Sequence, residues 1–389
     1  MRAKTFPIFL AFLCMGFGDA VATFVGKAKD TFELSNFEAQ IVSFVGFIMF
    51  GFLSVPMGVL QSKIGKKATL LSGLGLAFAG VLLVLVLGIS SYAVFLSAVL
   101  LLGAGAATLQ VAGNPIMRDV SREGDYSSNL SLGQFIKAIG SNTAPIVFFA
   151  VALLAGDKAA ENGTHFEWTL VFAIFAAGFA ATMAAVGALK ISEKKCENVA
   201  SVGSCVALLK SPFVFAMVAG IFLYVGAENC ISNGMPIYFT SRFGVSSDLA
   251  TQYITYFFLA IMFARLAGAA VLKRVEPKKF LAFSAALAVV GFALLFVSGK
   301  ALATVALFVI AIGYANIFPL IFSIAIDKMP EKANELSGLM VTAIVGAAVL
   351  PPVMGYAADL WGNKTAFAVP LIATLYVLGR ASSLKTEKK

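Results

Sequence analysis

Long stretches without charged residues alternate with short basic loops along most of the chain. The charge-free runs cover residues 39–62, 68–117, 168–189, 280–299, 301–326 and 336–358. A helix needs about 20 apolar residues to cross the hydrocarbon core of a bilayer. The run 68–117 is long enough for two helices, and residues 88–92 (Gly-Ile-Ser-Ser-Tyr) divide it. The pattern therefore predicts membrane-spanning helices joined by short loops.

Four further apolar stretches each contain one ionisable side chain. Asp19 lies in the first predicted span, Lys137 in the fifth, Glu228 in the seventh and Arg265 in the eighth. With a last span near 365–379, the pattern predicts twelve spans and an all-α, polytopic membrane protein. Composition agrees, because 60% of the 389 residues are hydrophobic and only 13% are charged. A soluble domain with so few charges would precipitate.

The basic residues are distributed unevenly between alternate loops. Of the 29 Lys and Arg residues, 21 fall in loops on one side, 6 fall on the other side and 2 lie within spans. Cytoplasmic loops carry the excess of Lys and Arg in membrane proteins. We therefore expect both termini in the cytoplasm, in a bacterial inner membrane. The formal charge of +9 is a topology signal, and no nucleic-acid partner is predicted.

The chain also contains an internal repeat. The pattern L-S-x8-G-x4-P begins at Leu130 and again at Leu336, 206 residues later, and Gly58 and Gly268 lie 210 apart. We interpret residues 1–190 and 211–389 as two six-helix bundles and residues 191–210 as a cytoplasmic linker. Parallel repeats of this kind are typical of secondary transporters that alternate around a site near the membrane midplane.

Several motifs resemble one transporter family. Residues 58–67 (GVLQSKIGKK) are similar to the G-x-L-x-D-R-x-G-R-R loop of the major facilitator superfamily, with Ser62 at the usual acidic position. Four other segments resemble its fucose–glucose–galactose symporter branch, the fucose permease family: 109–115 (LQVAGNP), 223–228 (LYVGAE), 316–323 (NIFPLIFS) and 345–355 (VGAAVLPPVMG). The resemblance covers nearly the whole chain. It implies the fold of this superfamily in two pseudosymmetric bundles, and transport of a monosaccharide with protons.

The chain departs from the family pattern at three polar positions. The resemblance implies a first-helix carboxylate where this chain has Ala22, a fourth-helix glutamate at Gln110 and a fifth-helix asparagine at Lys137. Two carboxylates that handle protons and sugar in the family are thus missing, and a cation is new. Asp19 lies nearly one turn before Ala22 and can substitute for the lost acid.

Asp19 and Lys137 are predicted to form an ion pair close to the cavity. An ionisable group in the hydrocarbon region costs a few kcal/mol. Desolvation would remove the proton from an isolated lysine, whereas a carboxylate partner keeps it charged. Our hypothesis is that proton uptake by Asp19 loosens its hold on Lys137 and so couples proton and solute binding. The alternative is a static pair that only fixes packing.

Other polar side chains within the spans are candidates for binding the solute. Amides and carboxylates can both donate to or accept from a polyol, although the same groups also serve as hydrogen bonds between helices. The predicted solute-binding residues are Gln110, Asn114, Gln134, Lys137, Tyr224, Glu228, Asn229, Asn233 and Asn316. Arg265, Lys63 and Lys66 are predicted to act in gating, Arg265 as a gate or a structural bridge.

No catalytic, phosphate-binding or metal-binding motif is visible, so an enzyme, a cofactor and a metal site are not predicted. Cys14, Cys196, Cys205 and Cys230 lack CxxC spacing and suit packing. The predicted function is a monomeric secondary transporter of a small polar solute, most simply a monosaccharide, coupled to a proton or, alternatively, sodium. An anionic solute held by Lys137 and uncoupled facilitation stay open. A channel is disfavoured, because a channel does not need two pseudosymmetric halves.

Overall fold

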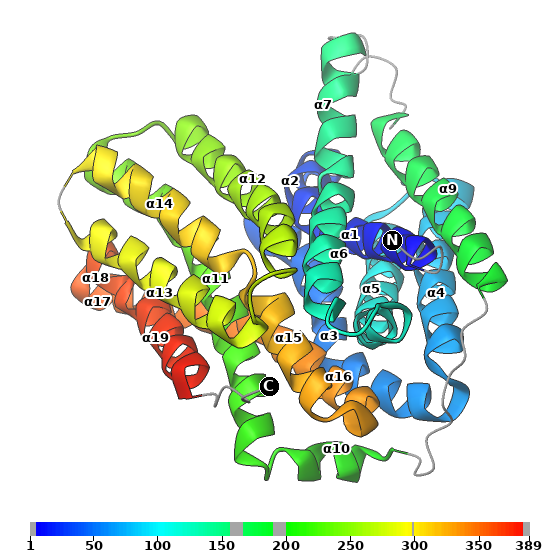
Figure 1. Ribbon diagram of the computed structural model, residues 1–389. Helices are drawn as coiled ribbons and strands as arrows, with labels where there is room; N and C mark the ends of the chain where they lie inside the picture. Colours follow the sequence, from blue (N-terminus) through cyan, green and yellow to red (C-terminus); the bar gives the residue numbers. More distant parts are fainter. Residues whose placement is uncertain (1–4, 156–165, 190–199, 298, 384–389) are drawn as a thin grey trace. The chain divides into compact units, whose positions relative to one another are not determined.

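A computed structural model describes residues 5–155, 166–189, 200–297 and 299–383 (Figure 1). Within these residues every assigned element is a helix. The charge-free run 68–117 forms two helices as predicted, α4 (Lys66–Leu87) and α5 (Tyr92–Val120). Gly88 ends α4 with a φ of 68°, a left-handed conformation that glycine adopts without steric cost.

Eleven stretches of the described chain are helical, long and apolar enough to cross a membrane. The predicted fifth span is absent from this set because it is divided into α6 (Tyr126–Ser141) and α7 (Thr143–Ala155). Each of these two helices is shorter than a full span. The structure therefore agrees with the predicted all-α polytopic fold, with the fifth span interrupted in its middle at Asn142, five residues after Lys137.

Three other predicted spans are also interrupted. The first is α1 (Phe6–Asp19) and α2 (Val21–Phe32), and the tenth is α14 (Lys300–Tyr314) and α15 (Ile317–Lys328). The eleventh consists of η1 (Pro330–Lys332), α16 (Ala333–Thr342), η2 (Ala343–Val345) and α17 (Gly346–Trp361). Non-helical backbone at membrane depth is tolerated only where protein or a water-filled cavity surrounds it. These interruptions therefore mark helices that face the protein interior.

The remaining helices are α3 (Asn36–Ile64), α9 (Phe166–Ala188), α10 (Val202–Leu208), α11 (Pro212–Phe243), α12 (Ser247–Val271), α13 (Pro277–Phe296), α18 (Asn363–Ala366) and α19 (Ala368–Ser383). The short helix α10 lies in the predicted linker 191–210. Residues 191–199 of that linker, which include Cys196, lie outside the described residues.

The chain divides into two compact units, each with many close approaches between its own Cα atoms. Unit 1 comprises Met1–Ser121, Ile136–Cys205 and Ala333–Thr342, and unit 2 comprises Arg122–Phe135, Val206–Lys332 and Ala343–Lys389. Each unit thus takes a segment from the other half of the sequence. The two exchanged segments are repeat-related, because 122–135 begins the fifth span and 333–342 begins the eleventh.

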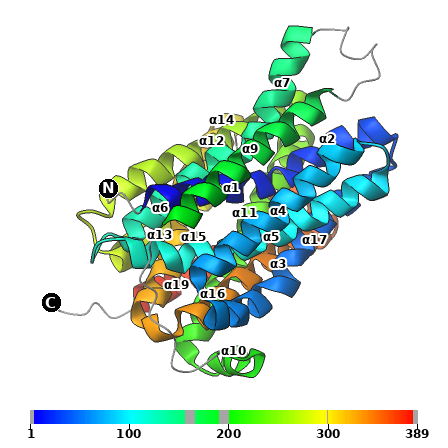
Figure 2. The same cartoon turned by 90° about the vertical axis from the view of Figure 1, so that its right-hand side faces the viewer.

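Within unit 1, α5 packs against α1, α3 and α4, and its middle is buried from Leu102 to Met117. The segment α16 packs against α3 and α5, as Figure 2 shows for α3. Aromatic rings fill the other end of the unit, where Phe24, Phe95 and Trp168 contact one another. This core fixes α1 and α5, the helices that carry Asp19 and Gln110.

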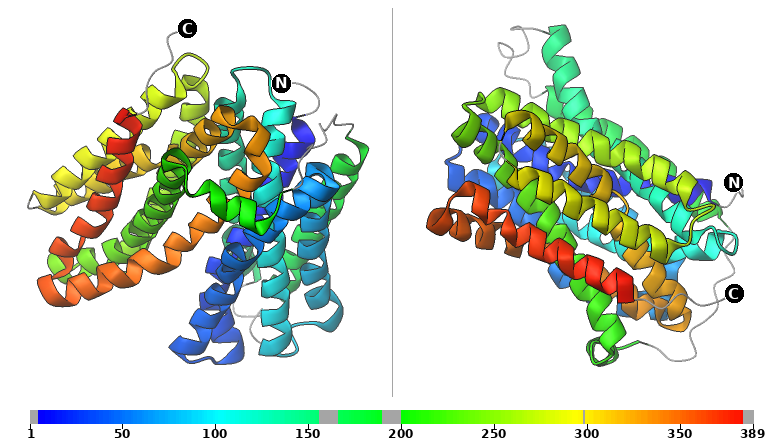
Figure 3. Two further views of the ribbon diagram at one scale, coloured as in Figure 1. Left: turned by 90° about the horizontal axis from the view of Figure 1, so that it is seen from below. Right: turned by 60° about the vertical axis from the view of Figure 1, so that its left-hand side comes forward.

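Within unit 2, α11 packs against α17 and α19, and α13 packs against α14 and α19. The helix α19, red in Figure 3, runs along α11 and α13. In the interior of this unit Tyr314 donates to or accepts from the Thr374 hydroxyl at 2.7 Å. The unit is therefore a second helical core, with α11 as the helix that carries Tyr224 and Glu228.

Candidate functional site

A pair of glycines brings α1 and α6 into backbone contact. A Cβ atom placed on Gly16 would lie 2.6 Å from the Ser141 nitrogen and 2.8 Å from the Gly140 Cα atom. A Cβ atom on Gly140 would lie 3.1 Å from the Gly16 Cα atom. Small residues allow helices to approach this closely in membranes. The crossing places Asp19, one turn after Gly16, beside Lys137, one turn before Gly140.

Asp19 and Lys137 form the ion pair that the sequence predicts. The Lys137 Nζ atom lies 2.9 Å from Asp19 Oδ2. Lys137 also donates to Gln110 Oε1 at 3.2 Å, and the Ser141 hydroxyl donates to Asp19 Oδ2 at 3.3 Å. The cluster of Asp19, Gln110, Lys137 and Ser141, called here the charged cluster, therefore joins α1, α5 and α6.

The charged cluster is only partly enclosed. The Lys137 side chain is 12% exposed, whereas that of Asp19 is 31% exposed. Asp19 is also the last residue of α1, at the interruption of the first span. Its carboxylate can thus be reached by water, while the lysine is held by two oxygen acceptors. A role for this pair in proton coupling stays a prediction.

Four of the predicted solute-binding amides are buried, among them Asn316 at 2% exposure. Gln110 is 3% exposed and Asn114, one turn later on α5, is fully buried. Gln134, one turn before Lys137 on α6 but assigned to unit 2, is 3% exposed, and its Nε2 atom has no hydrogen-bond partner among the described residues. A buried polar group without a partner is costly. The Gln134 Nε2 donor is therefore available to bind a solute hydroxyl, or another protein group in a different conformation of the transporter.

The predicted residues on α11 differ in what they contact. Tyr224 is 2% exposed and packs edge-on against Tyr314, with ring centroids 5.4 Å apart. Asn229 donates to the Val225 carbonyl of its own helix at 2.9 Å, whereas Asn233 is exposed. The Tyr224 ring is therefore part of the packing in this structure. A role for Tyr224 in stacking on a sugar stays a prediction.

Glu228 on α11 and Arg265 on α12 are half-buried charged side chains of unit 2. Both act electrostatically on the Tyr224 hydroxyl. Arg265 Nε donates to the Ala315 carbonyl at 3.0 Å, and Asn316 Nδ2 donates to the Ala264 carbonyl at 3.0 Å. These reciprocal bonds attach α12 to the interruption of the tenth span. Arg265 thus connects α12 to this interruption, and its role as a gate or a structural bridge stays a prediction.

The basic loop after α3 contains a contact that the sequence did not predict. Lys66 pairs with Asp119 at 2.5 Å, and Lys63 is exposed. The buried Gln61 Nε2 donates to Asn334 Oδ1 of α16 at 2.7 Å. Gating by Lys63 and Lys66 stays a prediction. Nothing in the sequence identifies Asn334 as the partner of Gln61, because the two residues lie 273 positions apart.

The sequence analysis also missed Gly16, whereas Gly140 is the glycine of the repeated L-S-x8-G-x4-P pattern that begins at Leu130. A signal was available, since Gly16 and Gly226 are separated by the repeat offset of 210 residues. Among the described residues, no group of three or more His, Cys, Asp or Glu side chains could hold a metal ion. Cys14, Cys205 and Cys230 are buried, which suits the predicted packing role.

Comparison with known sequences supports the family resemblance. A family model of the Major Facilitator Superfamily matches residues 8–344. The glucose/galactose transporter of Brucella abortus is 28% identical over 356 residues, covering 90% of this chain and 86% of that protein. The L-fucose-proton symporter of Escherichia coli is 26% identical over 386 residues, covering 91% and 87%.

A solved structure has the same fold. The crystal structure of the Major Facilitator Superfamily transporter FucP in the outward conformation matches with a TM-score of 0.85 and 22% sequence identity, covering 99% of this chain and all of the other. The protein belongs to the major facilitator superfamily.

Proposed function

We propose that this protein is a secondary active transporter that accumulates a neutral monosaccharide by symport with protons. The observation that carries the proposal is the charged cluster, in which a water-accessible carboxylate holds a lysine inside a membrane-spanning bundle. An ionisable pair at such a position marks a proton or substrate pathway by default. Relatives named for glucose, galactose and L-fucose transport support a monosaccharide as the solute.

In the proposed cycle, Asp19 takes up a proton from the outer side and loses its negative charge. Lys137 then keeps Gln110 as an acceptor but no longer has an anionic partner. The solute hydroxyls supply the missing acceptors, together with the buried amides of Gln110, Asn114, Gln134 and Asn316. After reorientation and release of the solute, Asp19 returns its proton to the inner side and the ion pair reforms.

The two predicted six-helix halves, residues 1–190 and 211–389, would alternate about this site, with the linker 191–210 between them. The protein would be a monomer in the bacterial cytoplasmic membrane with both termini inside, as the excess of basic residues in alternate loops supports. Glu228, Asn229, Asn233 and Tyr224 on α11 would supply the contacts from the second half. No cofactor is needed for this cycle.

The charged cluster does not favour an anionic solute. Lys137 already has a carboxylate at 2.9 Å and an amide oxygen at 3.2 Å. A solute carboxylate would have to displace Asp19 before it could bind. Once Asp19 has taken up its proton, a neutral polyol can hydrogen-bond to Lys137 and Gln110, and the relatives named for glucose, galactose and L-fucose favour such a solute over a sugar acid.

The experiment is uptake into proteoliposomes that contain the purified protein. Labelled glucose, galactose, fucose and acidic sugars are compared with and without an inward proton gradient, and with an inward sodium gradient. The proposal expects accumulation of a neutral sugar above the external concentration only when the proton gradient is present. Liposomes without protein and gradients collapsed by a protonophore are the controls.

Three outcomes contradict parts of the proposal in different ways. Accumulation that depends on the sodium gradient would mean that sodium, and not the proton, is the coupling ion. Accumulation of acidic sugars alone makes Lys137 the substrate anchor. Equilibration without accumulation, at any gradient, leaves an uncoupled facilitator and removes the proposed role of Asp19.

A further inference from the structure

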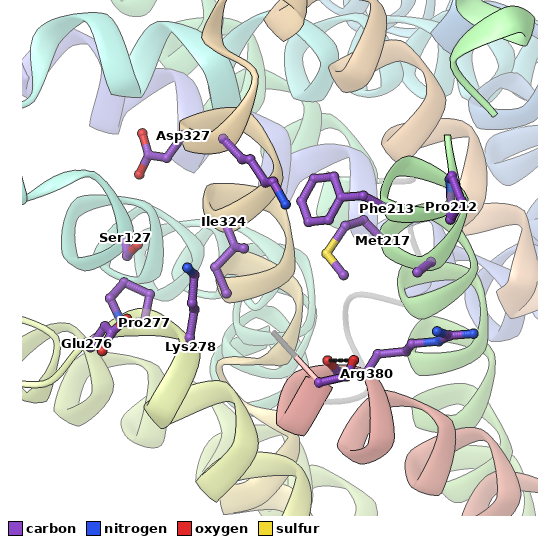
Figure 4. A pocket seen from close by; sticks show the side chains of 13 residues that line it. Ser127, Pro212, Phe213, Met217, Glu276, Pro277, Lys278, Ile324, Asp327 and Arg380 are labelled. Atoms are coloured by element: carbon purple, nitrogen blue, oxygen red, sulfur yellow. Dashed lines mark hydrogen bonds between the residues drawn. The ribbon is translucent and has the colours of Figure 1, made fainter. Parts of the chain in front are cut away.

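Unit 2 contains a cavity of about 690 Å³ that shares no lining residue with the charged cluster. Its walls come from the ends of helices, namely the start of α11, the start of α13, the end of α15 and the end of α19 (Figure 4). Ser127, at the start of α6, completes the lining. All these elements belong to one unit, so the cavity is defined by the packing of that unit alone.

The lining has two kinds of surface. Phe213, Met217 and Ile324 form an apolar wall, as Figure 4 shows. The charged side chains are three cations and two carboxylates: Lys278, Lys328, Arg380, Glu276 and Asp327. An excess of positive charge next to an apolar wall is suited to an amphipathic anion.

Two of the cations have aromatic partners that leave their N–H groups available. The Lys328 Nζ atom lies 4.1 Å from the centroid of the Phe213 ring. The Arg380 guanidinium carbon lies 5.3 Å from the centroid of the Tyr376 ring. A cation over a ring face is stabilised without using its hydrogen-bond donors. Both side chains are exposed and can therefore also contact a ligand.

The cavity lies at the helix ends that connect to the basic loops. Lys273, Arg274 and Lys279 are in the neighbouring loop and at the start of α13. Under the proposed membrane orientation, this is the cytoplasmic boundary of the bilayer. Basic pockets between helices on the cytoplasmic side bind acidic lipid head groups. The apolar wall would contact the start of an acyl chain, which a free phosphate ion lacks.

We infer that this cavity binds the phosphate head group of an anionic phospholipid, with Lys328 and Arg380 as its ligands. The inference rests on the proposed orientation but not on the solute or the coupling ion. Lys278 contributes charge to the same cavity. Occupation would attach the ends of α11, α15 and α19 to the inner leaflet.

The test is native mass spectrometry of the full-length protein with added phosphatidylglycerol or phosphatidylcholine. The double variant Lys328→Ala, Arg380→Ala is compared with Lys273→Ala, Arg274→Ala, which removes the same charge from the same side outside the cavity. We expect the first variant to weaken phosphatidylglycerol binding about tenfold and the second to change it less than twofold. Lys328→Arg, Arg380→Lys, which keeps both charges, should restore binding and exclude misfolding.

Two results would overturn the inference. Equal losses in the two alanine variants would mean that only general surface charge attracts the lipid. Competition by millimolar inorganic phosphate, with no dependence on the acyl chain, would make this a site for a soluble anion. Because binding is measured without transport, failure here leaves the uptake results unaffected, and the reverse also holds.

Discussion

The two units contain the same glycine-mediated helix crossing, but only one of the two crossings is charged. In unit 1, Gly16 contacts Gly140 between the first and fifth spans. In unit 2, a Cβ atom on Gly226 would lie 2.8 Å from the Gly346 carbonyl oxygen, between the seventh and eleventh spans. The repeat offsets of 210 and 206 relate the two glycine pairs. The backbone contact is thus a property of the repeat.

The side chains one turn from these glycines are different. Asp19 follows Gly16 by three residues, and Asn229 follows Gly226 by three. Lys137 precedes Gly140 by three, and the equivalent residue before Gly346 is Ala343. Unit 2 therefore forms the crossing with a neutral amide and a methyl group. A crossing of this kind can therefore form without charges, and we predict that the ion pair of unit 1 serves transport and not packing.

The largest effect on transport is expected when the charge that distinguishes unit 1 is removed. Asp19→Asn should abolish proton-driven accumulation, lowering it about 100-fold to the background of empty liposomes, because the amide cannot take up the coupling proton. Exchange of labelled for unlabelled solute should persist. The matched control is Asp30→Asn, an exposed carboxylate later in the same span, which should accumulate normally. Accumulation by Asp19→Asn would end the proposed coupling role.

The glycine pairs should be equally important for stability in the two units. Gly16→Val and Gly226→Val each force a side chain against neighbouring backbone, and overpacking costs about 1–3 kcal/mol or more. Thermal unfolding of the detergent-solubilised protein should show a lower melting temperature for both. Gly75→Val is the control, since a Cβ atom on Gly75 meets nothing within 4 Å. Equal melting of Gly16→Val and Gly75→Val would contradict the close crossing.

Gln110 and Asn316 occupy equivalent positions of the repeat, 206 residues apart, so that the same substitution can be compared in the two units. Gln110 accepts from a charged lysine, whereas Asn316 donates to a backbone carbonyl. Hydrogen bonds to charged groups are worth about 1.5–3 kcal/mol and neutral ones about 0.5–1.5. We expect Gln110→Ala to lower the initial uptake rate at least tenfold and Asn316→Ala about threefold. Gln110→Glu, which keeps an oxygen acceptor for Lys137, should retain most of the uptake activity. Equal losses of uptake in Gln110→Ala and Asn316→Ala would argue against a special role for the hydrogen bond to the charged Lys137.

The smallest expected effect is the change in stability of a variant in which two residues of the unit 1 crossing are replaced by their unit 2 equivalents. Asp19→Asn combined with Lys137→Ala gives the first crossing the residues of the second. Replacing a buried ion pair by neutral groups is often close to neutral for stability. The melting temperature should therefore stay near that of the wild type, although accumulation is lost. A large drop would show that the pair is a packing element after all.

The sequence by itself determined the number and course of the spans. Charge-free runs and their interruption at 88–92 specify membrane helices because the bilayer penalises every unpaired polar group. The repeat offsets and the single ionisable residues in four spans also pointed to Asp19 and Lys137 as partners. These features are local or periodic, so that one chain is enough to detect them.

The tertiary structure alone decided which groups complete the site. Ser141 joins Asp19 because Gly16 and Gly140 bring α1 and α6 into contact, and Gln110 joins Lys137 because α5 packs beside them. No periodic pattern in the sequence predicts that α6 ends shortly after Lys137. The same is true of the hydrogen bond between Gln61 and Asn334. Contacts between residues far apart in the chain depend on helix rotation and crossing, and a charge pattern along one helix does not specify either.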